Sequence, residues 1–243
     1  MKNASCDISI IIPAYNEAGR IKQTLIEINR TLSVVDYSSE VLVIDDGSTD
    51  NTRGVVRQVK SDRIKLIGYP HNRGKGFAVN YGVMHAKGQF ILFCDADNAT
   101  PFEQIELLMN QMRDKVCDVA IASRHLKQSR ISENQSAHRR LAAKFGNWLI
   151  QLLLLPGIAD TQCGFKIFTR HAAKIIFTRQ TIWGWGFDIE LLYIARLHQL
   201  KIAEVPVRWI NMSGSKLQSP LVFLQTLGEL FRIKLKSVRG VYR

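Results

Sequence analysis

The chain has 243 residues, of which 46% are hydrophobic and 22% are charged. Both fractions are typical of a globular protein, which argues against a disordered chain, a collagen or a simple coiled coil. Lys and Arg number 33 against 21 Asp and Glu, so the net charge is +12. A strongly basic protein usually meets something anionic, such as nucleic acid, a membrane surface or a phosphorylated substrate.

The cysteines and the apolar segments bear on the compartment of the protein. The four cysteines form no C-x-x-C pair, and we expect free thiols in a reducing compartment. No apolar leader follows Met1, and no stretch reaches the roughly 18 apolar residues that a membrane-spanning helix needs. We therefore expect a cytoplasmic protein, either soluble or peripheral at the cytoplasmic face of a membrane.

The first half of the chain alternates segments typical of strands with segments typical of helices. Short apolar runs predict strands that are buried on both faces, at residues 8–12, 41–44, 64–67, 90–94 and 119–122. Apolar residues at helical spacing predict helices at residues 17–32, 74–87 and 103–113, and a cap near Asn51 predicts one more. This alternation predicts an α/β fold with a Rossmann-like, mainly parallel sheet and helices on both faces.

The second half of the chain is richer in helical patterns. We expect helices at residues 141–155, 187–200 and 221–235, and a late strand at 202–209. The apolar faces of the first and last of these helices, next to a basic tail, are typical of contact with a membrane interface. Core packing or a dimer contact would explain the same pattern.

Acidic residues follow two of the predicted strands directly. Asp95 and Asp97 come after the strand at 90–94, and Asp45 and Asp46 come after the strand at 41–44. Ligands of open α/β sheets bind outside the carboxyl ends of the strands. Two carboxylates at such an end suit Mg²⁺, and an acid can also accept hydrogen bonds from a base or a ribose. Solvated turns and helix caps are the alternatives.

A glycine-rich turn precedes the predicted helix at 74–87. The run from Asn72 to Gly76 can bring backbone N–H groups and Lys75 near a phosphate, although a turn needed only for packing is the alternative. It is not a P-loop, and no G-x-G-x-x-G follows the first strand, which disfavours a dinucleotide-binding fold.

Six motifs carry a resemblance to known proteins. Those in the first half are Ile-Ile-Ile-Pro-Ala-Tyr-Asn-Glu at 10–17, Val-Ile-Asp-Asp-Gly-Ser-Thr-Asp at 43–50 and Asp-Ala-Asp at 95–97. Those in the second half are Asp-Thr-Gln-Cys-Gly-Phe-Lys at 160–166, Trp-Gly-Phe-Asp-Ile-Glu-Leu-Leu at 185–192 and Gly-Ser-Lys-Leu at 214–217. The first set resembles the family 2 inverting glycosyltransferases, which have the GT-A fold. The second set is similar to dolichyl-phosphate β-glucosyltransferases, and polyprenyl-phosphate mannosyltransferases share the plan.

The resemblance implies a substrate pair, a cofactor and a set of site residues. It implies transfer of a hexose, with UDP-glucose favoured, to a polyprenyl (dolichyl) phosphate with inversion, supported by Mg²⁺ or Mn²⁺ on Asp95 and Asp97. With Lys75 from the glycine-rich turn, the expected nucleotide-sugar residues are Pro13, Tyr15, Glu17, Asp45, Asp46, Lys75, Asp95, Ala96, Asp97 and Lys216. The acceptor phosphate is expected to meet Arg124, Arg139 and Arg140.

The same resemblance divides a single GT-A domain over residues 1–243 into functional parts. Residues 6–125 form the expected nucleotide-sugar half, 126–220 the acceptor half and 221–243 an amphipathic basic helix. The expected catalytic residues are Asp95, Asp97, Arg124 and Asp188.

A phosphate acceptor changes what the catalytic residues have to do. Its second pKa is near ~6, so it is largely dianionic at neutral pH and needs no general base. We interpret Asp188 as contacting the sugar or orienting a cationic side chain, with a helix cap as the alternative. A GDP-mannose-dependent transferase is the enzymatic alternative. A basic nucleic-acid-binding protein is the non-enzymatic one, although the chain has no recognised nucleic-acid motif.

Overall fold

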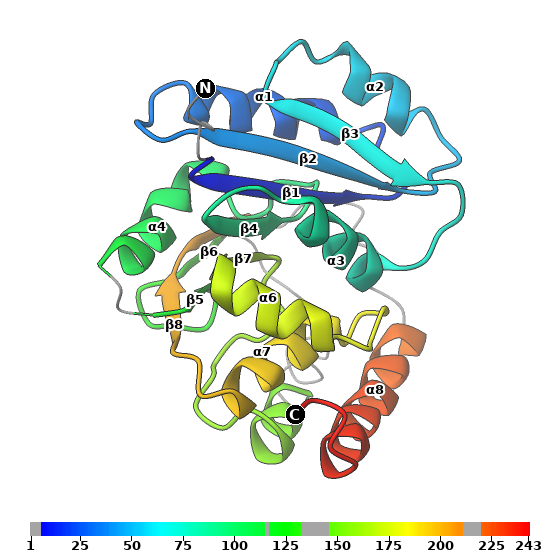
Figure 1. The fold of residues 1–243 in the computed structure, drawn as a ribbon, viewed down its shortest axis with the longest axis vertical. Coiled ribbons are helices and arrows are strands. Elements are labelled where there is room, and N and C mark those ends of the chain that lie inside the picture. Colours follow the sequence, from blue (N-terminus) through cyan, green and yellow to red (C-terminus); the bar gives the residue numbers. More distant parts are fainter. Residues whose placement is uncertain (1–5, 115–116, 133–145, 211–219) are drawn as a thin grey trace.

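The computed structural model describes residues 6–114, 117–132, 146–210 and 220–243. A seven-stranded sheet in the order β3-β2-β1-β4-β7-β5-β8 runs through the molecule, and a second sheet contains β6 and β9 (Figure 1). The strands are β1 (Ile8–Ala14), β2 (Ser39–Asp46), β3 (Ile64–Tyr69), β4 (Phe90–Cys94), β5 (Val119–Ser123), β6 (Arg130–Ser132), β7 (Phe165–Thr169), β8 (Ile202–Pro206) and β9 (Arg208–Ile210). The helices are α1 (Ile21–Leu32), α2 (Thr52–Gln58), α3 (Lys75–His85), the 3₁₀ turn η1 (Phe102–Gln104), α4 (Ile105–Arg113), α6 (Arg170–Arg179), α7 (Phe187–Leu197) and α8 (Pro220–Val238).

The large sheet is parallel except for β7. Strands β1, β2, β3 and β4 pair in parallel, as do β5 and β8. Strand β7 lies between β4 and β5 and is antiparallel to both, so β4 and β5 still point the same way. The expected α/β fold with a mainly parallel sheet is confirmed, and β7 and the following α6 are elements that the apolar pattern did not reveal.

Alternate residues of each strand fill two different cores. Ile11 and Phe93 belong to the core that includes residues of α3, α6 and α7, and Figure 1 shows α3 and α6 in front of the sheet. Ile10, Ile12 and Leu92 belong to the core that includes residues of α1 and α4. Strands buried on both faces lack polar alternation, which explains why they appear in the sequence as continuous apolar runs.

The first helix begins later than the spacing predicts. Its expected start is Glu17, but α1 begins at Ile21. Asn16 adopts a positive φ of 54°, its backbone N–H donates to the Ser48 hydroxyl at 3.0 Å, and its side-chain oxygen accepts from the Thr49 N–H at 2.8 Å. These bonds to the loop after β2 hold residues 15–20 as a turn across the end of β1.

Two expected segments of the second half also differ in extent. The expected strand at 202–209 is divided, because β8 ends at Pro206, which has no backbone N–H, and β9 pairs instead with β6. Within the expected helix at 141–155, residues 146–153 are helical and the part before 146 lies outside the described residues. None of the helices in the described part of the chain combines the length and hydropathy needed to cross a bilayer.

Candidate active site

Three polar strand ends meet at one edge of the large sheet. Strands β2, β1 and β4 are neighbours, and a cleft of about 340 Å³ opens beyond their carboxyl ends. Eight of the expected nucleotide-sugar residues line this cleft: Pro13, Tyr15, Glu17, Asp46, Lys75, Asp95, Ala96 and Asp97. The cleft is also lined by Asn72 and Gly74 of the glycine-rich turn and by Trp185. Three further lining residues were not expected there, namely Ala14, Arg20 and Gly184.

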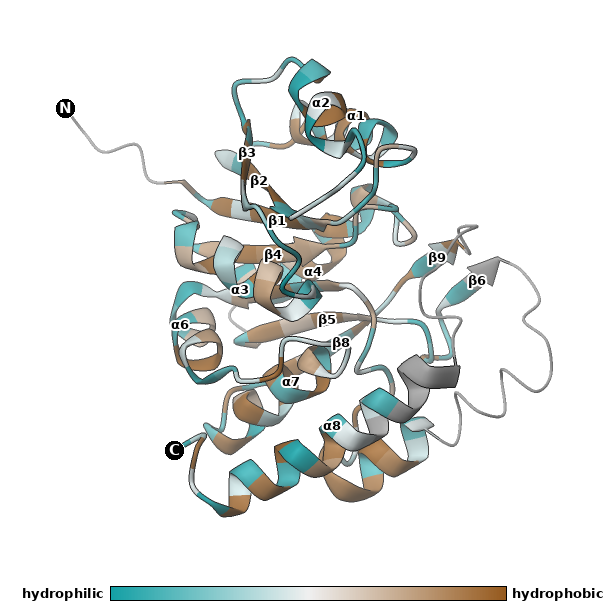
Figure 2. Ribbon diagram, turned by 90° about the vertical axis from the view of Figure 1, so that its right-hand side faces the viewer, coloured by the Kyte–Doolittle hydropathy of each residue, from teal (hydrophilic) through white to brown (hydrophobic). Residues whose placement is uncertain are grey.

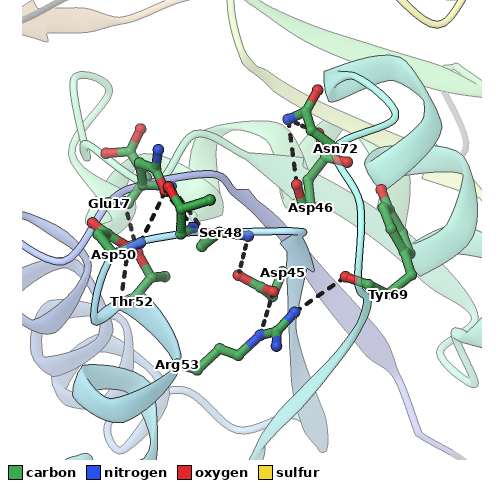
Figure 3. A network of polar contacts seen from close by, with 11 residues as sticks. Glu17, Asp45, Asp46, Ser48, Asp50, Thr52, Arg53, Tyr69 and Asn72 are labelled. Carbon is green, nitrogen blue, oxygen red and sulfur yellow. Dashed lines mark hydrogen bonds and ion pairs between the residues drawn. The ribbon is translucent and has the colours of Figure 1, made fainter.

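Asp46 organises the glycine-rich turn that precedes α3. Its carboxylate accepts a hydrogen bond from the Asn72 amide at 2.9 Å (Figure 3). It also accepts from the Arg73 N–H at 2.7 Å and the Gly74 N–H at 3.1 Å. The turn is therefore fixed to the end of β2. This contact sets the position of Lys75, the first residue of α3.

Asp45 has a different environment from its neighbour. It is buried, and its carboxylate pairs with the Arg53 guanidinium at 2.6 Å and accepts from the Ser48 N–H at 3.3 Å (Figure 3). Asp45 is not among the residues that line the cleft. The structure thus assigns it contacts within the protein, and Arg53 is a partner that no local motif indicates.

The Asp-Ala-Asp segment after β4 concentrates negative charge in the cleft. The Lys75 ammonium lies 2.5 Å from the Asp95 carboxylate. Burial raises the pKa of Asp97, and the nearby Asp95 carboxylate raises it further. Burial opposes the charge of Lys75, but Asp95, Asp188 and Asp97 outweigh burial and raise its pKa. One lysine therefore faces several carboxylates.

Gly164 allows the Asp95 carboxylate its position. A Cβ on Gly164 would lie 2.0 Å from an Asp95 carboxylate oxygen, so any larger residue would displace that side chain. The Asp95 N–H also donates to the Gly164 carbonyl at 3.0 Å. The Cys-Gly-Phe-Lys part of the motif at 160–166 is therefore a direct neighbour of the acids.

The donor set at this point fits a magnesium or manganese ion. Mg²⁺ is usually bound by one or two carboxylates together with substrate phosphates. Asp95 and Asp97 supply two carboxylates, and among the described residues no group of three or more His, Cys, Asp or Glu forms a complete cage. Crowded carboxylates of this kind need a cation, and an ion that is shared with a bound diphosphate suits them.

A smaller pocket of about 80 Å³ adjoins the cleft at Asp95. The two pockets share Lys75, Asp95, Asp97 and Trp185 as lining residues. The smaller one adds two of the expected catalytic residues, Arg124 and Asp188, and is also lined by Trp209. All four expected catalytic residues therefore lie around one continuous site.

Arg124 is held by a buried aspartate. Its Nε and Nη2 donate to the two carboxylate oxygens of Asp160 at 2.7 and 2.9 Å. The Glu204 carboxylate accepts from the N–H groups of Ala159 and Asp160 and so fixes the loop that carries Asp160. A guanidinium has five N–H donors, so Asp160 engages only part of this group.

Asp188 is paired with a buried lysine. Its carboxylate accepts from the Lys166 ammonium, which also donates to the Cys163 carbonyl at 2.7 Å. Lys166 is fully buried in β7, which is why it could not be recognised as a partner before the antiparallel strand was known. Burial raises the pKa of Asp188, while Lys166 and Lys75 oppose this increase.

Some expected residues cannot be placed. Arg139, Arg140 and Lys216 lie outside the described residues. Asp160 and Lys166, which hold two of the catalytic candidates, were visible only as members of the motif at 160–166, since 36 and 22 positions separate them from Arg124 and Asp188.

Comparison with known proteins gives the family. A model of glycosyl transferase family 2 matches residues 9–177. The chain is 36% identical to the dolichyl-phosphate beta-glucosyltransferase of Homo sapiens, over 97% of this chain and 77% of that protein. It is 33% identical to the enzyme of that name from Saccharomyces cerevisiae, over 97% and 76%.

Solved structures agree with the fold. Glucosyl-3-phosphoglycerate synthase from Mycobacterium tuberculosis superposes with a TM-score of 0.70 at 20% identity, covering 95% of this chain and 80% of that one. A complex of the same synthase with Mn²⁺, UDP-glucose and phosphoglyceric acid gives a TM-score of 0.68 at 20% identity, covering 95% and 80%. The fold is that of the GT-A glycosyltransferases. The chain belongs to glycosyl transferase family 2, as its motifs indicate.

The Arg124–Asp160 pair makes stability depend on pH in a defined range. Burial alone would raise the pKa of Asp160, but Arg124 outweighs burial and lowers the pKa from 3.8 to about 2. The pair therefore stabilises the fold fully above pH 4, and this contribution is lost as the pH falls from 4 to 2. Urea denaturation gives the free energy of unfolding of wild type and of Asp160→Asn. The gap between the two should be about 2 kcal/mol smaller at pH 2 than above pH 4.

The matched control is Glu103→Gln, which removes an exposed ion pair with Arg208. Its difference from wild type should stay within about 0.5 kcal/mol over the same range. A constant gap for Asp160→Asn would show that the pair is not the origin of the effect.

Proposed function

We propose that this protein transfers glucose from UDP-glucose to dolichyl phosphate with inversion, giving a β-linked glucosyl phospholipid. Glucosyl transfer to a dolichyl phosphate is supported by the names of relatives that are 33% and 36% identical over 97% of the chain. UDP-glucose as donor is supported by its presence, with Mn²⁺, in a structure of the same fold.

One observation carries the proposal: the acidic pair at the sheet edge lies beside two cationic side chains, Lys75 and Arg124, that are fixed by ion pairs. Asp95 and Asp97 suit a donor diphosphate with its metal ion, and Lys75 and Arg124 border the pocket where a second anion would lie. A site for a single anion would not need both the acidic cleft and the adjoining cationic pocket. A nucleotide sugar with its metal ion would fill the first, and a lipid phosphate the second.

The reaction needs few groups from the protein. A phosphate oxygen of the acceptor forms a bond to the anomeric carbon of glucose while the bond from that carbon to the UDP oxygen breaks, so UDP leaves with the electron pair. Attack from the face opposite UDP inverts the configuration. Lys75 and Arg124 hold the two anions in reach of each other, and their fixed positions avoid reorganisation during the step.

Asp95 and Asp97 would hold the Mg²⁺ or Mn²⁺ ion. When bound, such an ion neutralises the negative charge that grows on the departing diphosphate. Lys75 contributes positive charge at the same point through its contact with Asp95.

The central experiment is a product assay with a panel of donors. Wild type with a short-chain dolichyl phosphate and Mg²⁺ should give the mass of a glucosyl product from UDP-glucose and none from GDP-mannose, and proton NMR should show the β anomer. Asp95→Asn and Asp97→Asn should each lower kcat by on the order of 10²-fold, and chelation of divalent ions should abolish turnover.

Asp36→Asn, an exposed acid outside the site, serves as the control and should retain wild-type turnover. A mannosyl product, or full turnover by the double Asp95→Asn, Asp97→Asn variant, would contradict the proposal.

Asp188 acts in this scheme as an orienting group and not as a base. Its carboxylate is engaged by the buried Lys166, and a dianionic phosphate has no proton to give up. Asp188→Asn should therefore lower kcat by about tenfold. The rate should still fall at low pH, because the acceptor phosphate becomes protonated at about pH 6.

The pH profile of kcat/KM between pH 5 and 9 checks this, with the acceptor held well below its KM. A general base contributes about 10²–10⁴-fold. Loss of that size, together with disappearance of the fall at low pH, would identify Asp188 as a base.

We also propose that the protein docks peripherally on the cytoplasmic face of an anionic bilayer. Five apolar side chains on α8 and the helical segment 146–153 are at least half exposed. They are Trp148, Leu152, Phe231, Leu235 and Val238, and together they form the exposed apolar surface. Figure 2 shows hydrophobic residues, coloured brown, along α8. The two helices touch, since the Lys234 ammonium reaches the Leu153 carbonyl at 3.5 Å. Exposed Arg232, Lys234, Arg239 and Arg243 add positive charge.

Replacing Phe231 and Leu235 by Glu should release the protein from vesicles. Burial of two such side chains and attraction of basic residues to anionic lipid are each worth a few kcal/mol, so partitioning into phosphatidylserine vesicles should fall at least about tenfold. Flotation measures the effect, and turnover of a water-soluble short-chain acceptor should persist. The control Val34→Glu changes an exposed apolar residue after α1. Equal flotation of the double variant and wild type would contradict this surface.

A further inference from the structure

The only acid among the last 39 residues of the chain binds a backbone N–H next to the cleft. Glu229 lies on α8, and its carboxylate accepts a hydrogen bond from the Gly186 N–H at 2.6 Å. Gly186 caps the start of α7. Burial raises the pKa of the Glu229 carboxyl, as expected for a half-buried acid that faces protein and not water. The contact joins α8 to the segment of residues 183–186.

Two glycines of that segment leave space for the same carboxylate. A Cβ on Gly184 would lie 2.3 Å from one Glu229 carboxylate oxygen, and a Cβ on Gly186 would lie 2.7 Å from the other. At both positions the three nearest atoms all belong to Glu229. Neither glycine has a positive φ, so backbone conformation gives no other reason for a glycine there. The Gly-Trp-Gly sequence is thus shaped around Glu229.

The residue between the two glycines lines the site. Trp185 borders both the cleft and the smaller pocket, and its ring centroid lies 5.9 Å from the Lys75 ammonium. The segment is also bonded to the start of α3, because the Gly76 N–H donates to the Trp183 carbonyl at 2.9 Å. Displacement of residues 183–186 would therefore move Trp185 and disturb Lys75, the cation that contacts Asp95.

We propose that Glu229 is a positioning residue for the donor site. From α8 it fixes the positions of Trp185 and Lys75 through its contact with residues 183–186. The inference rests on the proposed function only for the identity of the donor. Its physical content is that the geometry of the cleft depends on α8 through one carboxylate. Since α8 also carries part of the exposed apolar surface, contact with a bilayer and binding of the donor are joined by the same helix.

The test uses the full chain and a set of variants that separates positioning from folding. Glu229→Ala should raise the KM for UDP-glucose about tenfold, since it removes a hydrogen bond to a charged group, and should change kcat less than threefold. Glu229→Gln keeps an acceptor oxygen and should restore most of the loss. Gly184→Ala displaces the carboxylate and should reproduce the effect of Glu229→Ala.

The double variant Glu229→Ala, Gly184→Ala decides the matter. If the glycine exists to admit the carboxylate, the double variant should be no worse than either single one. Glu103→Gln is the control and should keep the wild-type KM and melting temperature. Multiplied losses in the double variant, or an unchanged KM in Glu229→Ala, would overturn the proposal.

A calorimetric measurement of UDP binding with Mn²⁺ keeps this result separate from the proposed reaction. If wild type transfers no glucose, the proposed function fails. Glu229→Ala should then still raise the dissociation constant for UDP about tenfold. Equal UDP affinity of wild type and Glu229→Ala would overturn the role of Glu229 whatever the reaction.

Discussion

Repulsion between carboxylates at the end of β4 is the constraint to which the rest of the site responds. Asp95 and Asp97 lie in the same short segment, and burial together with Asp95 raises the pKa of Asp97. Two carboxylates that interact in this way destabilise each other unless a cation lies between or beside them. Lys75 provides one positive charge, held in place by a turn that Asp46 fixes to β2. The remaining negative charge would suit the divalent ion of the proposed function.

Arg124 and Lys166 are held in place by carboxylates of the protein itself. Arg124 is held by Asp160, and Lys166 is held against Asp188 with no exposure to water. Burying such groups costs several kcal/mol each, and their pairing offsets part of that cost. A charge fixed in this way stabilises a bound anion or a leaving group without having to reorient, which is the main source of electrostatic catalysis in proteins.

How far the sequence predicts the structure follows from the range of the interactions involved. The strands of the first half could be predicted because burial on both faces leaves continuous apolar runs, and the acids after them could be placed because parallel strands end at one edge. Strand β7 could not, since it contains a fully buried lysine, and the partners Asp160 and Lys166 depend on packing between segments more than 20 positions away. The turn at residues 15–20 is set by the loop after β2, whereas apolar spacing alone extends the helix through it.

The distribution of charge explains more than the net value of +12. The cleft is bordered by Glu17, Asp46, Asp95 and Asp97, whereas exposed cations gather on the last turns of α8 and the tail after it. A duplex of nucleic acid would be repelled from the first surface and attracted to the second. Under the proposed function the same separation orients the molecule, because an anionic bilayer attracts the basic end while the acidic cleft is left to a metal-bound nucleotide. Glu229 also joins α8 to the Gly-Trp-Gly segment, so the helix proposed to contact the bilayer touches the wall of the cleft. An enzyme that moves a sugar from a water-soluble donor to a membrane-bound acceptor needs a connection of this kind between its donor site and its membrane surface.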